Sequence, residues 1–275
     1  MHLTYQGLSK RPLSFTRMTG LTIQEFKELV NKIAPSYQQI EESKLCHGRN
    51  SRLVTLADKL LCVLIYYRTY ITHVFLGYLF NLDASNICRL LKKLEPLLAK
   101  KITITKDRSL TPQEVLKVLA DVREQATQRP TKKQKKSYSG KKKRHTIKTE
   151  IILEEQGKII SVSRSHRGST HDFRIRKQEK LLARERIKIA DAGYQGWQKI
   201  QSNVVLPYKR SKKWPLTKDQ KEHNNKLSSF RMRIEHKIRE IKIFKIMSEV
   251  YRNFQKKYNL RFNIIAGLVN FKHAF

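Results

Sequence analysis

The fold of this 275-residue chain is indicated by two short apolar runs that each end in an aspartate, Val115-Leu-Lys-Val-Leu-Ala-Asp121 and Ile187-Lys-Ile-Ala-Asp191. Their aliphatic and β-branched residues predict two strands, over 115–120 and 187–190, each ending at its aspartate. Between the two strands the sequence predicts a hairpin and a helix, and beyond them a further strand and two helices. The predicted ranges are His145–Leu153 and Lys158–Ser163, joined through Gln156 and Gly157, for the hairpin, then Phe173–Glu185 (helix), Val204–Leu206 (strand), Thr217–Ile246 (helix) and Phe254–Phe271 (helix).

This order of elements predicts an α/β fold with a mixed central sheet. Hairpin strands pair antiparallel, whereas a helical crossover favours a parallel neighbour. A ribonuclease H-like sheet is one arrangement with this order, although periodicity alone does not single it out. A polar stretch, Lys100–Pro112, precedes these elements, so we expect the α/β domain to occupy residues 110–275.

Residues 1–109 are expected to form an all-α domain, because apolar residues recur there at helical spacing. A short helix from Ile71 to Phe80, a turn over Asn81–Asp83 and a second helix opened by Asp83 or Ser85 give the outline of a helix-turn-helix. Pro96 is expected to bend or end the second helix.

The second helix of such a motif suggests a DNA-reading surface. In the DNA-binding form of the motif, the start of this helix faces the major groove. That placement would direct Ser85, Asn86 and Arg89 to base edges and would let Lys92 and Lys93 reach phosphates. A plain helical hairpin with solvated polar residues is the alternative, because one sequence encodes helix-turn-helix geometry weakly.

The charge balance calls for a polyanionic partner. The chain has 58 Lys and Arg against 23 Asp and Glu, a formal net charge of +35, whereas a net charge of about 2 to 8 keeps a small domain soluble. Nucleic acid is the first candidate and an anionic membrane surface the second. The longest apolar run, Leu60–Tyr67, is far shorter than the roughly 20 residues of a membrane span. With no secretory signal and no Cys-x-x-Cys pair, we expect an intracellular protein without a disulfide framework.

Asp121 and Asp191 are expected to converge if their strands are neighbours, since α/β sheets open their ligand crevices at strand ends. Two close anions repel each other unless one is protonated or a cation bridges them. Mg²⁺ binds through one or two carboxylates and through substrate phosphate oxygens, and two such ions with a third carboxylate support phosphodiester displacement. The alternative is that each aspartate is a simple turn cap.

Further motifs follow Asp121 in a fixed order. They are Asp121-Val-Arg-Glu-Gln125, Gln128-Arg-Pro130, Tyr138-Ser-Gly-Lys-Lys-Lys-Arg-His-Thr-Ile-Lys148, Gly168-Ser-Thr-His-Asp172, Ala190-Asp-Ala-Gly-Tyr-Gln-Gly196, Arg231-Met-Arg-Ile-Glu-His236 and Ile241-Lys-Ile-Phe-Lys-Ile246. This order, together with the helix-turn-helix from about Leu53, resembles the DDE transposases of bacterial insertion sequences, in the endonuclease group related to Harbinger-like elements. Arg123 stands where many relatives have Thr, and Arg167 where many have Pro.

The resemblance implies a ribonuclease H-like fold in which Asp121, Asp191 and Glu235, 70 and 44 positions apart, are the catalytic and metal-binding acids. It implies Mg²⁺, as two ions, with Mn²⁺ as a substitute. It implies a transposase that binds the terminal repeats of its element, cuts DNA at the element ends by metal-assisted hydrolysis and joins the 3′-hydroxyl ends to target DNA. Such a protein would work as a homo-oligomer on DNA, in the bacterial cytoplasm at the nucleoid.

The residues around these acids have competing interpretations. Arg231 and Arg239 stand four positions before and after Glu235 and could pair with it, and Glu240 is a nearby competitor for its role. We expect Asp172 to cap or complement the dipole of the helix that follows it. His171 and His236 are expected to contact phosphate or to order the site, and Tyr194 and Trp197 either to pack in the core or to stack on an unpaired base.

The segment Arg129–Lys148 is the most basic part of the sequence, with ten Lys or Arg and no acid. It is either a solvated loop or a track for the DNA backbone. The DNA contacts predicted from it are Lys141, Lys142, Lys143, Arg144 and Lys148.

Two rival functions stay open from the sequence. One is a decayed or repurposed transposase that keeps only sequence-specific DNA binding. The other is a metal-dependent nuclease that cuts DNA but joins no ends.

Overall fold

A computed structural model describes the chain except for residues 1, 44–50, 103, 105–116, 211–214 and 273–275. The chain forms two compact units, one of Met1–Thr103, Ile241–Glu249 and Leu260–Phe275 and the other of Ile104–Glu240 and Val250–Asn259. The two C-terminal segments of the first unit therefore pack with the N-terminal helices. The expected boundary between residues 109 and 110 lies outside the described residues, and the division into domains 1–109 and 110–275 stays a prediction.

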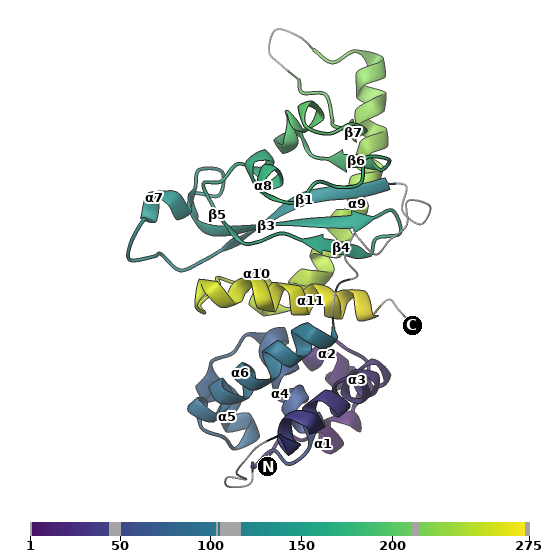
Figure 1. The fold of residues 1–275 in the computed structure, drawn as a ribbon. Coiled ribbons are helices and arrows are strands. Elements are labelled where there is room, and N and C mark those ends of the chain that lie inside the picture. The colour runs from purple at the N-terminus through teal and green to yellow at the C-terminus, as the bar shows by residue number, and fades with distance from the viewer. Residues whose placement is uncertain (1, 44–50, 103, 105–116, 211–214, 273–275) are drawn as a thin grey trace. The chain divides into compact units, whose positions relative to one another are not determined.

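The first unit is helical, with α4 at its centre (Figure 1). All eight residues of α4 from Leu60 to Tyr67 are buried, because α2, α3, α6 and α10 pack around it. Among the described residues, no helix is long and apolar enough to cross a membrane. The helices are α1 (Tyr5–Ser9), α2 (Pro12–Thr19), α3 (Ile23–Glu42), α4 (Leu56–Thr69), α5 (His73–Phe80), α6 (Ala84–Lys101), α10 (Lys245–Ser248) and α11 (Tyr258–Lys272). The first two residues of α11, Tyr258 and Asn259, belong to the second unit.

The helix, turn and helix expected around residue 80 are present as α5 and α6. Thr72 caps α5 by accepting a hydrogen bond from the Phe75 amide, so the helix begins two residues later than expected. Asn81 adopts a left-handed conformation at the end of α5, and the Leu82 amide donates to the Gly77 carbonyl. This pairing closes the turn before α6 begins.

Pro96 does not end α6, contrary to part of the sequence prediction. The helix continues to Lys101 because Leu97 and Leu98, directly after the proline, are buried in the core of the unit. Burial of two leucines outweighs the lost backbone hydrogen bond, and Pro35 is likewise tolerated inside α3.

The second unit is built on a mixed sheet of order β2-β3-β1-β6-β7, with β4 and β5 also paired to β3. β1 pairs antiparallel with β3 and parallel with β6, so the predicted mixed sheet is confirmed. The strands are β1 (Lys117–Ala126), β2 (Tyr138–Ser139), β3 (Arg144–Glu154), β4 (Ile159–Val162), β5 (His166–Arg167), β6 (Ile187–Ala190) and β7 (Val204–Val205). The helices are α7 (Gln134–Ser137), α8 (Asp172–Gln178), η2 (Ala192–Tyr194), η3 (Trp197–Lys199), α9 (Lys218–Ile243) and η4 (Gln255–Lys257).

β1 does not end at Asp121, so that part of the prediction is wrong. The strand runs on to Ala126, because antiparallel pairing with β3 continues as far as Ala126↔Thr146. Its parallel pairing with β6 stops at Ala120↔Ala190. Asp121 therefore lies where the neighbouring strand β6 ends, and not where β1 itself ends. The predicted start of this strand, residues 115–116, lies outside the described residues.

Three predicted helices are shorter than expected. The last of them, α11, begins at Tyr258 and not at residue 254, because the separate turn η4 precedes it. α8 ends at Gln178 and not at residue 185, because Glu179 turns extended and Leu182 enters the core of the unit. The long helix predicted to residue 246 breaks after Ile243, where the extended Phe244 precedes α10. The short elements β2, β5 and α7 were not predicted.

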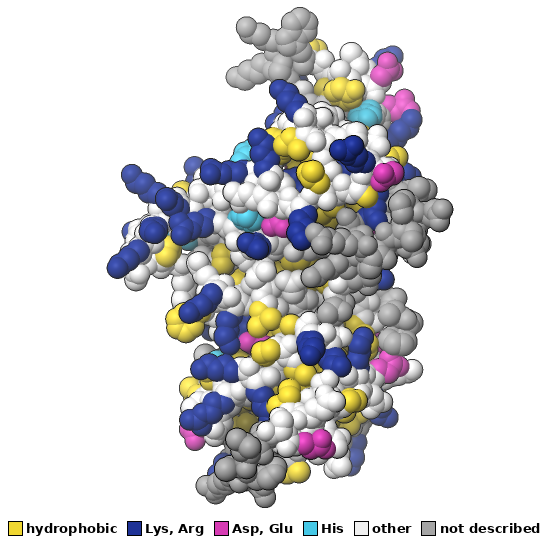
Figure 2. All heavy atoms as spheres, viewed as in Figure 1, with side chains coloured by type: hydrophobic (Ala, Val, Ile, Leu, Met, Phe, Trp, Pro, Cys, Tyr) yellow, Lys and Arg dark blue, Asp and Glu magenta, His cyan; other side chains and the backbone are white. Residues whose placement is uncertain are grey.

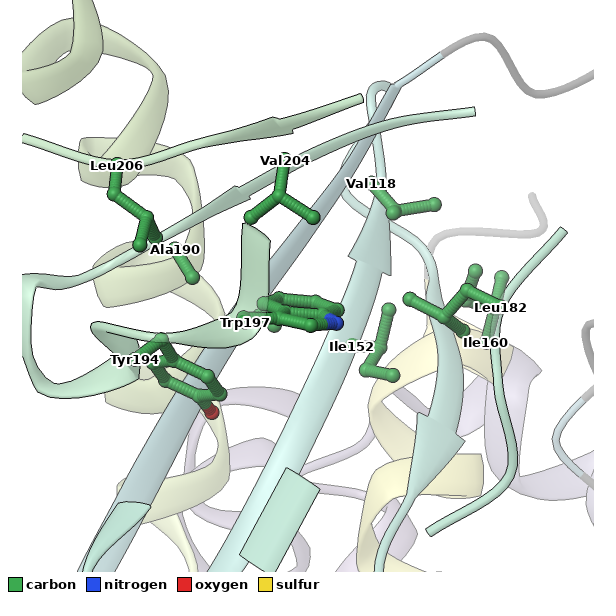
Figure 3. Packing of buried hydrophobic residues seen from close by; sticks show 10 residues of the cluster. Val118, Ile152, Ile160, Leu182, Ala190, Tyr194, Trp197, Val204 and Leu206 are labelled. Atoms are coloured by element: carbon green, nitrogen blue, oxygen red, sulfur yellow. The ribbon is translucent and has the colours of Figure 1, made fainter. Parts of the chain in front are cut away.

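One hydrophobic cluster holds the sheet of the second unit against the turns that follow β6 (Figure 3). Tyr194 and Trp197, each 1% exposed, lie within it. They therefore pack in the core, and neither presents a free face to a base. The cluster is Val118, Ala120, Ile152, Ile160, Leu182, Ala190, Tyr194, Trp197, Val204 and Leu206.

Candidate active site

The register of β1 and β6 places Asp121 and Asp191 at adjacent positions. The parallel pairing ends at Ala120↔Ala190, and each aspartate is the next residue of its segment. Since neighbouring strands lie about 4.8 Å apart, the two residues lie side by side where the parallel pairing of β1 and β6 ends. The convergence that the sequence made conditional on neighbouring strands is thus present.

Backbone amides and one arginine hold the two carboxylates. Asp191 accepts a hydrogen bond from the Ala192 amide at 2.6 Å, and Asp121 accepts one from the Val122 amide at 2.8 Å. The guanidinium of Arg231, on α9, lies 3.3 Å from the Asp191 carboxylate. Both partners of this ion pair are about a third exposed, at 33% and 38%, so it is accessible to solvent and to a ligand.

Burial raises the pKa of Asp121 to about 6, and the neighbouring Asp191 and Asp172 carboxylates add to the rise. The Val122 amide and the Arg231 guanidinium act in the opposite direction. A partly desolvated carboxylate among other carboxylates is an environment that a hard cation relieves. The oxygen donors of Asp121 and Asp191 therefore fit a divalent ion such as Mg²⁺.

Asp172 joins this acidic group from the first turn of α8. Its carboxylate lies 3.0 Å from the Lys148 ammonium on β3. A Cβ at position 193 would come within 2.9 Å of the Asp172 carboxylate, which explains the glycine in the turn after Asp191. His171 is the N-cap residue of α8 and its side chain accepts no cap hydrogen bond; Asp172 follows in the first turn, where its charge stands as expected for a dipole partner.

Glu235 is not brought to the two aspartates. It is exposed on α9, one turn beyond Arg231, while Ile234 and Ile238 face the core. Arg231 pairs with Asp191 and not with Glu235, and Glu240 pairs with Lys237. No group of three or more His, Cys, Asp or Glu in the described ranges is placed to hold a metal ion. His171 and His236 are exposed, and their predicted roles stay predictions.

A buried polar group that the sequence analysis missed lies on the β3 side of the site. Glu150, 1% exposed, accepts hydrogen bonds from Arg176 at 2.6 Å and from the Tyr194 hydroxyl at 3.0 Å. Burial raises the pKa of Glu150 to about 7 against the opposing effect of Arg176 and Tyr194. Tyr194 follows Asp191 by three residues, so its bond to β3 anchors the turn that carries Asp191. A single glutamate within the apolar run of β3 was the signal available in the sequence.

The helix-turn-helix exposes most of its predicted contact residues. Ser85, Asn86 and Arg89 are exposed at the start of α6, and Arg89 donates to the Asn86 side chain at 3.0 Å. Lys92 is exposed as well. Lys93 instead forms an ion pair with Glu41, and its ammonium lies 4.8 Å from the centroid of the Tyr37 ring. Both partners are on α3, so the charge of Lys93 is already neutralised by that helix.

The predicted DNA contacts of the basic segment Arg129–Lys148 differ in exposure. Lys141, Lys142, Lys143 and Arg144 are exposed at the turn into β3 and its first residue. Lys148 lies deeper and donates to the Thr170 carbonyl and to Asp172. Lys148 thus neutralises an acid of the site in the described structure, and its DNA contact stays a prediction.

Comparisons with known proteins assign these features to one class. Residues 120–270 match the family model described as DDE superfamily endonuclease, and residues 51–104 match the helix-turn-helix of DDE superfamily endonuclease. The matches cover the acidic edge of the sheet and the α5–α6 motif. The fold and the site together define an endonuclease with a DNA-binding helical region.

Similar proteins show which kind of endonuclease this is. The chain is 36% identical, over 94% of both chains, to a probable transposase for insertion sequence element IS702 from Microchaete diplosiphon. It is 26% identical, over 70% of its length and 72% of the relative, to a putative transposase for insertion sequence element IS112 from Streptomyces albus G. No solved structure matches the chain. The chain belongs to the DDE transposases of bacterial insertion sequences.

Proposed function

We propose that this transposase binds the terminal repeats of its element and cuts DNA at the element ends by Mg²⁺-assisted hydrolysis. The resulting 3′-hydroxyl ends would then be joined to target DNA. The observation that carries this proposal is the β1–β6 register, which sets Asp121 beside Asp191 at the open end of a parallel pair. We propose that it acts in the bacterial cytoplasm at the nucleoid.

In this proposal Asp121 and Asp191 hold the metal, as two Mg²⁺ ions or with Mn²⁺ as a substitute. The bound metal would supply charge stabilisation at the attacking and leaving oxygens of the phosphodiester. Asp191 is oriented for this by the Ala192 amide and by the Tyr194–Glu150 anchor. Arg231 neutralises Asp191 when no metal is bound and would be released toward a DNA phosphate when one is.

Glu235 is the proposed third acid, supplied from α9. It lies one turn beyond Arg231, which already contacts Asp191, so a modest shift or rotation of α9 on DNA would bring it closer. Helical residues four positions apart lie on the same face about 5 to 6 Å apart. His171, His236 and Asp172 remain candidates for ordering the site.

The strand order supports a ribonuclease H-like assignment of the catalytic unit. Three antiparallel strands, β4, β3 and β1, are followed by the parallel strands β6 and β7. Two element ends must be processed together, so we propose a homo-oligomer assembled on DNA.

Cleavage and joining can be tested with labelled terminal repeats and a target plasmid. The wild type should cut and join with Mg²⁺ and be inactive in EDTA. Asp121→Asn and Asp191→Asn should lose at least about 100-fold in cleavage and keep DNA binding, whereas Asp219→Asn, an exposed aspartate of α9, should be unaffected. Glu235→Gln should lose cleavage while Glu240→Gln retains it.

The same assay separates the rival functions. Two observations favour a protein that retains only DNA binding: Arg231 is paired with Asp191, and Glu235 forms no metal-binding group with the two aspartates in the described structure. Such a protein would show no Mg²⁺-dependent cleavage even as wild type. A nuclease without strand transfer would cut the repeats but yield no joined product.

A further inference from the structure

A hollow of about 500 Å³ opens on the second unit, apart from the two aspartates. Four segments that are distant in sequence line it: the residues before and within α7, the start of β3, the loop into β5, and η4 with the start of α11. Its cationic lining residues are Lys132, Lys133, Arg164, Arg167 and Lys256.

In the part of the chain that the structure describes, the side chains of these five cations are paired with no acid, while the Glu179 carboxylate lies 3.7 Å from His166, another residue of the lining. The lining contains no Asp or Glu, and none of the five side chains forms an ion pair or a hydrogen bond with any described residue. All five are exposed. Two other cations of the unit, Lys148 and Arg176, are by contrast paired with Asp172 and Glu150. Like charges around one hollow repel each other, and a bound anion would relieve this repulsion.

The backbone under these cations is fixed. β5 pairs with β3 at Ile147↔Arg167, and the Arg164 amide donates to Glu179 at 3.1 Å. Ser169 donates its hydroxyl to the Lys136 carbonyl at 2.6 Å, which ties the segment after β5 to α7. Ser165 donates to Asn259 at 3.4 Å, and this bond joins the loop to the start of α11. The cations are therefore presented by a connected scaffold and not by a free loop.

The lining favours phosphate over an apolar ligand. Hydroxyl and amide side chains accompany the cations, including Ser137, Thr146 and Asn259. Five separate cations spread over such a volume suit several phosphates of one chain better than a single anion. Figure 2 shows Lys and Arg side chains gathered over the end of this unit that carries α7.

The hollow is too far from the aspartates to bind the phosphate that reacts. Ile147 lines it, and Ile151, four residues further along β3, is the partner of Asp121. Four residues of strand span roughly 13 Å, or about four base pairs of duplex at 3.4 Å each.

We propose that this hollow binds the phosphodiester backbone of DNA that flanks the reacting bond. It would be a second DNA-binding site of the catalytic unit, beside the one at Asp121 and Asp191. This inference rests on the proposed function, because it assumes that DNA lies at Asp121 and Asp191. It also gives Arg167, which departs from the common family pattern, a role at the hollow.

Lysine acetylation of the full chain, read by mass spectrometry, tests the location. A non-specific duplex of about 30 base pairs should protect Lys132, Lys133 and Lys256 at least about threefold, and should leave Lys218 and Lys221, exposed on α9, unchanged. Orthophosphate at the same phosphate concentration should protect none of them. Equal protection by orthophosphate, or no protection by the duplex, would overturn the proposal.

The salt dependence of duplex binding tests the energetics. Each phosphate contact contributes about 0.9 to the slope of log K against log salt, so Arg164→Ala/Arg167→Ala should lower the slope by about 2. The matched variant Lys218→Ala/Lys221→Ala removes the same charge from α9 and should leave the slope within about 0.5. Equal losses in both variants would mean that net charge alone is responsible and would overturn the proposal.

The proposed function and this inference fail in different ways. If the wild type neither binds nor cuts DNA, the proposed function fails. If it cuts terminal repeats while the Arg164/Arg167 variant keeps the full salt slope, only the assignment of the hollow is wrong. Far-ultraviolet circular dichroism of both double variants checks that the fold is intact.

Discussion

Asp121 is a carboxyl group whose charge is disfavoured by burial and by the two carboxylates near it. Its pKa in the folded chain is about 6, whereas an aspartate in an unfolded chain titrates near 3.9. The folded state therefore binds this proton more tightly than the unfolded state. Linkage then requires the stability from this residue to be present below about pH 4 and to be lost as the pH rises through about 6.

Replacing this carboxyl should flatten part of the pH dependence. In EDTA, the free energy of unfolding of the wild type should fall, relative to that of Asp121→Asn, by roughly 1 to 2 kcal/mol between pH 4.5 and pH 7.5, after discounting for partial exposure. Urea unfolding at the two pH values measures this difference. Parallel pH profiles for the two proteins would contradict the assignment of the shift to Asp121.

Glu150 and Arg176 form a buried ion pair beneath the same edge of the sheet, with 2.6 Å between the charged groups. Removing only one charge leaves the other buried without a partner, which costs about 3 to 5 kcal/mol. Arg176→Met should therefore lower the melting temperature by several degrees or more. Adding Glu150→Gln to that variant should recover part of the loss, since the uncompensated charge is then gone. No recovery in the double variant would mean that packing over Trp197 dominates.

The turn between α5 and α6 depends on the absence of a side chain at Gly77. A Cβ there would collide with the Leu82 carbonyl oxygen, part of the backbone that closes the turn. Ser85, Asn86 and Arg89 follow directly on α6, so their placement depends on this turn.

Gly77→Ala should destabilise the first unit by about 1 to 3 kcal/mol, the usual cost of overpacking, and should weaken binding to the terminal repeats at least about tenfold. Gly140→Ala is the matched control, because a Cβ at that position meets nothing within 4 Å. The two variants should be compared by thermal unfolding and by titration of labelled DNA. Equal effects of both substitutions would refute the packing argument.

The C-terminal helix α11 is part of the same compact unit as the N-terminal helices. Arg261 of α11 pairs at 2.6 Å with Glu95 of α6, which is fully buried and also accepts a hydrogen bond from Tyr67. Gly267 of α11 lies against Ile102, where a Cβ would meet its carbonyl. The first unit therefore includes a helix that lies far from it in sequence.

A fragment of residues 1–103 should not fold as the full chain does. Without α11 the Glu95 carboxylate loses its buried partner, and apolar surface of α4 and α6 is exposed. We expect the fragment to bind a hydrophobic dye such as ANS and to unfold without a sharp thermal transition. A cooperative transition close to that of the full chain would show that the N-terminal helices are an independent domain.

The elements that sequence periodicity predicted well are those with strong local patterns. The hairpin of β3 and β4, the short strand β6 and the α5–α6 motif all carry alternation, apolar runs or caps that act within a few residues. The predictions failed where a distant partner decides the outcome. β1 continues past Asp121 because β3 pairs with it, and α6 continues past Pro96 because two leucines are buried.

From the sequence one can predict the family, the mixed α/β class, the helical region before it, the excess of positive charge and the two aspartates. These follow from residue type and spacing, which are properties of the chain whatever its conformation. The folded chain is needed to see that Arg231 neutralises Asp191, that Glu150 anchors Tyr194, that five cations without a described partner surround one hollow and that α11 completes the first unit. Each of these depends on segments far apart in sequence meeting in space, and no local pattern encodes such a meeting.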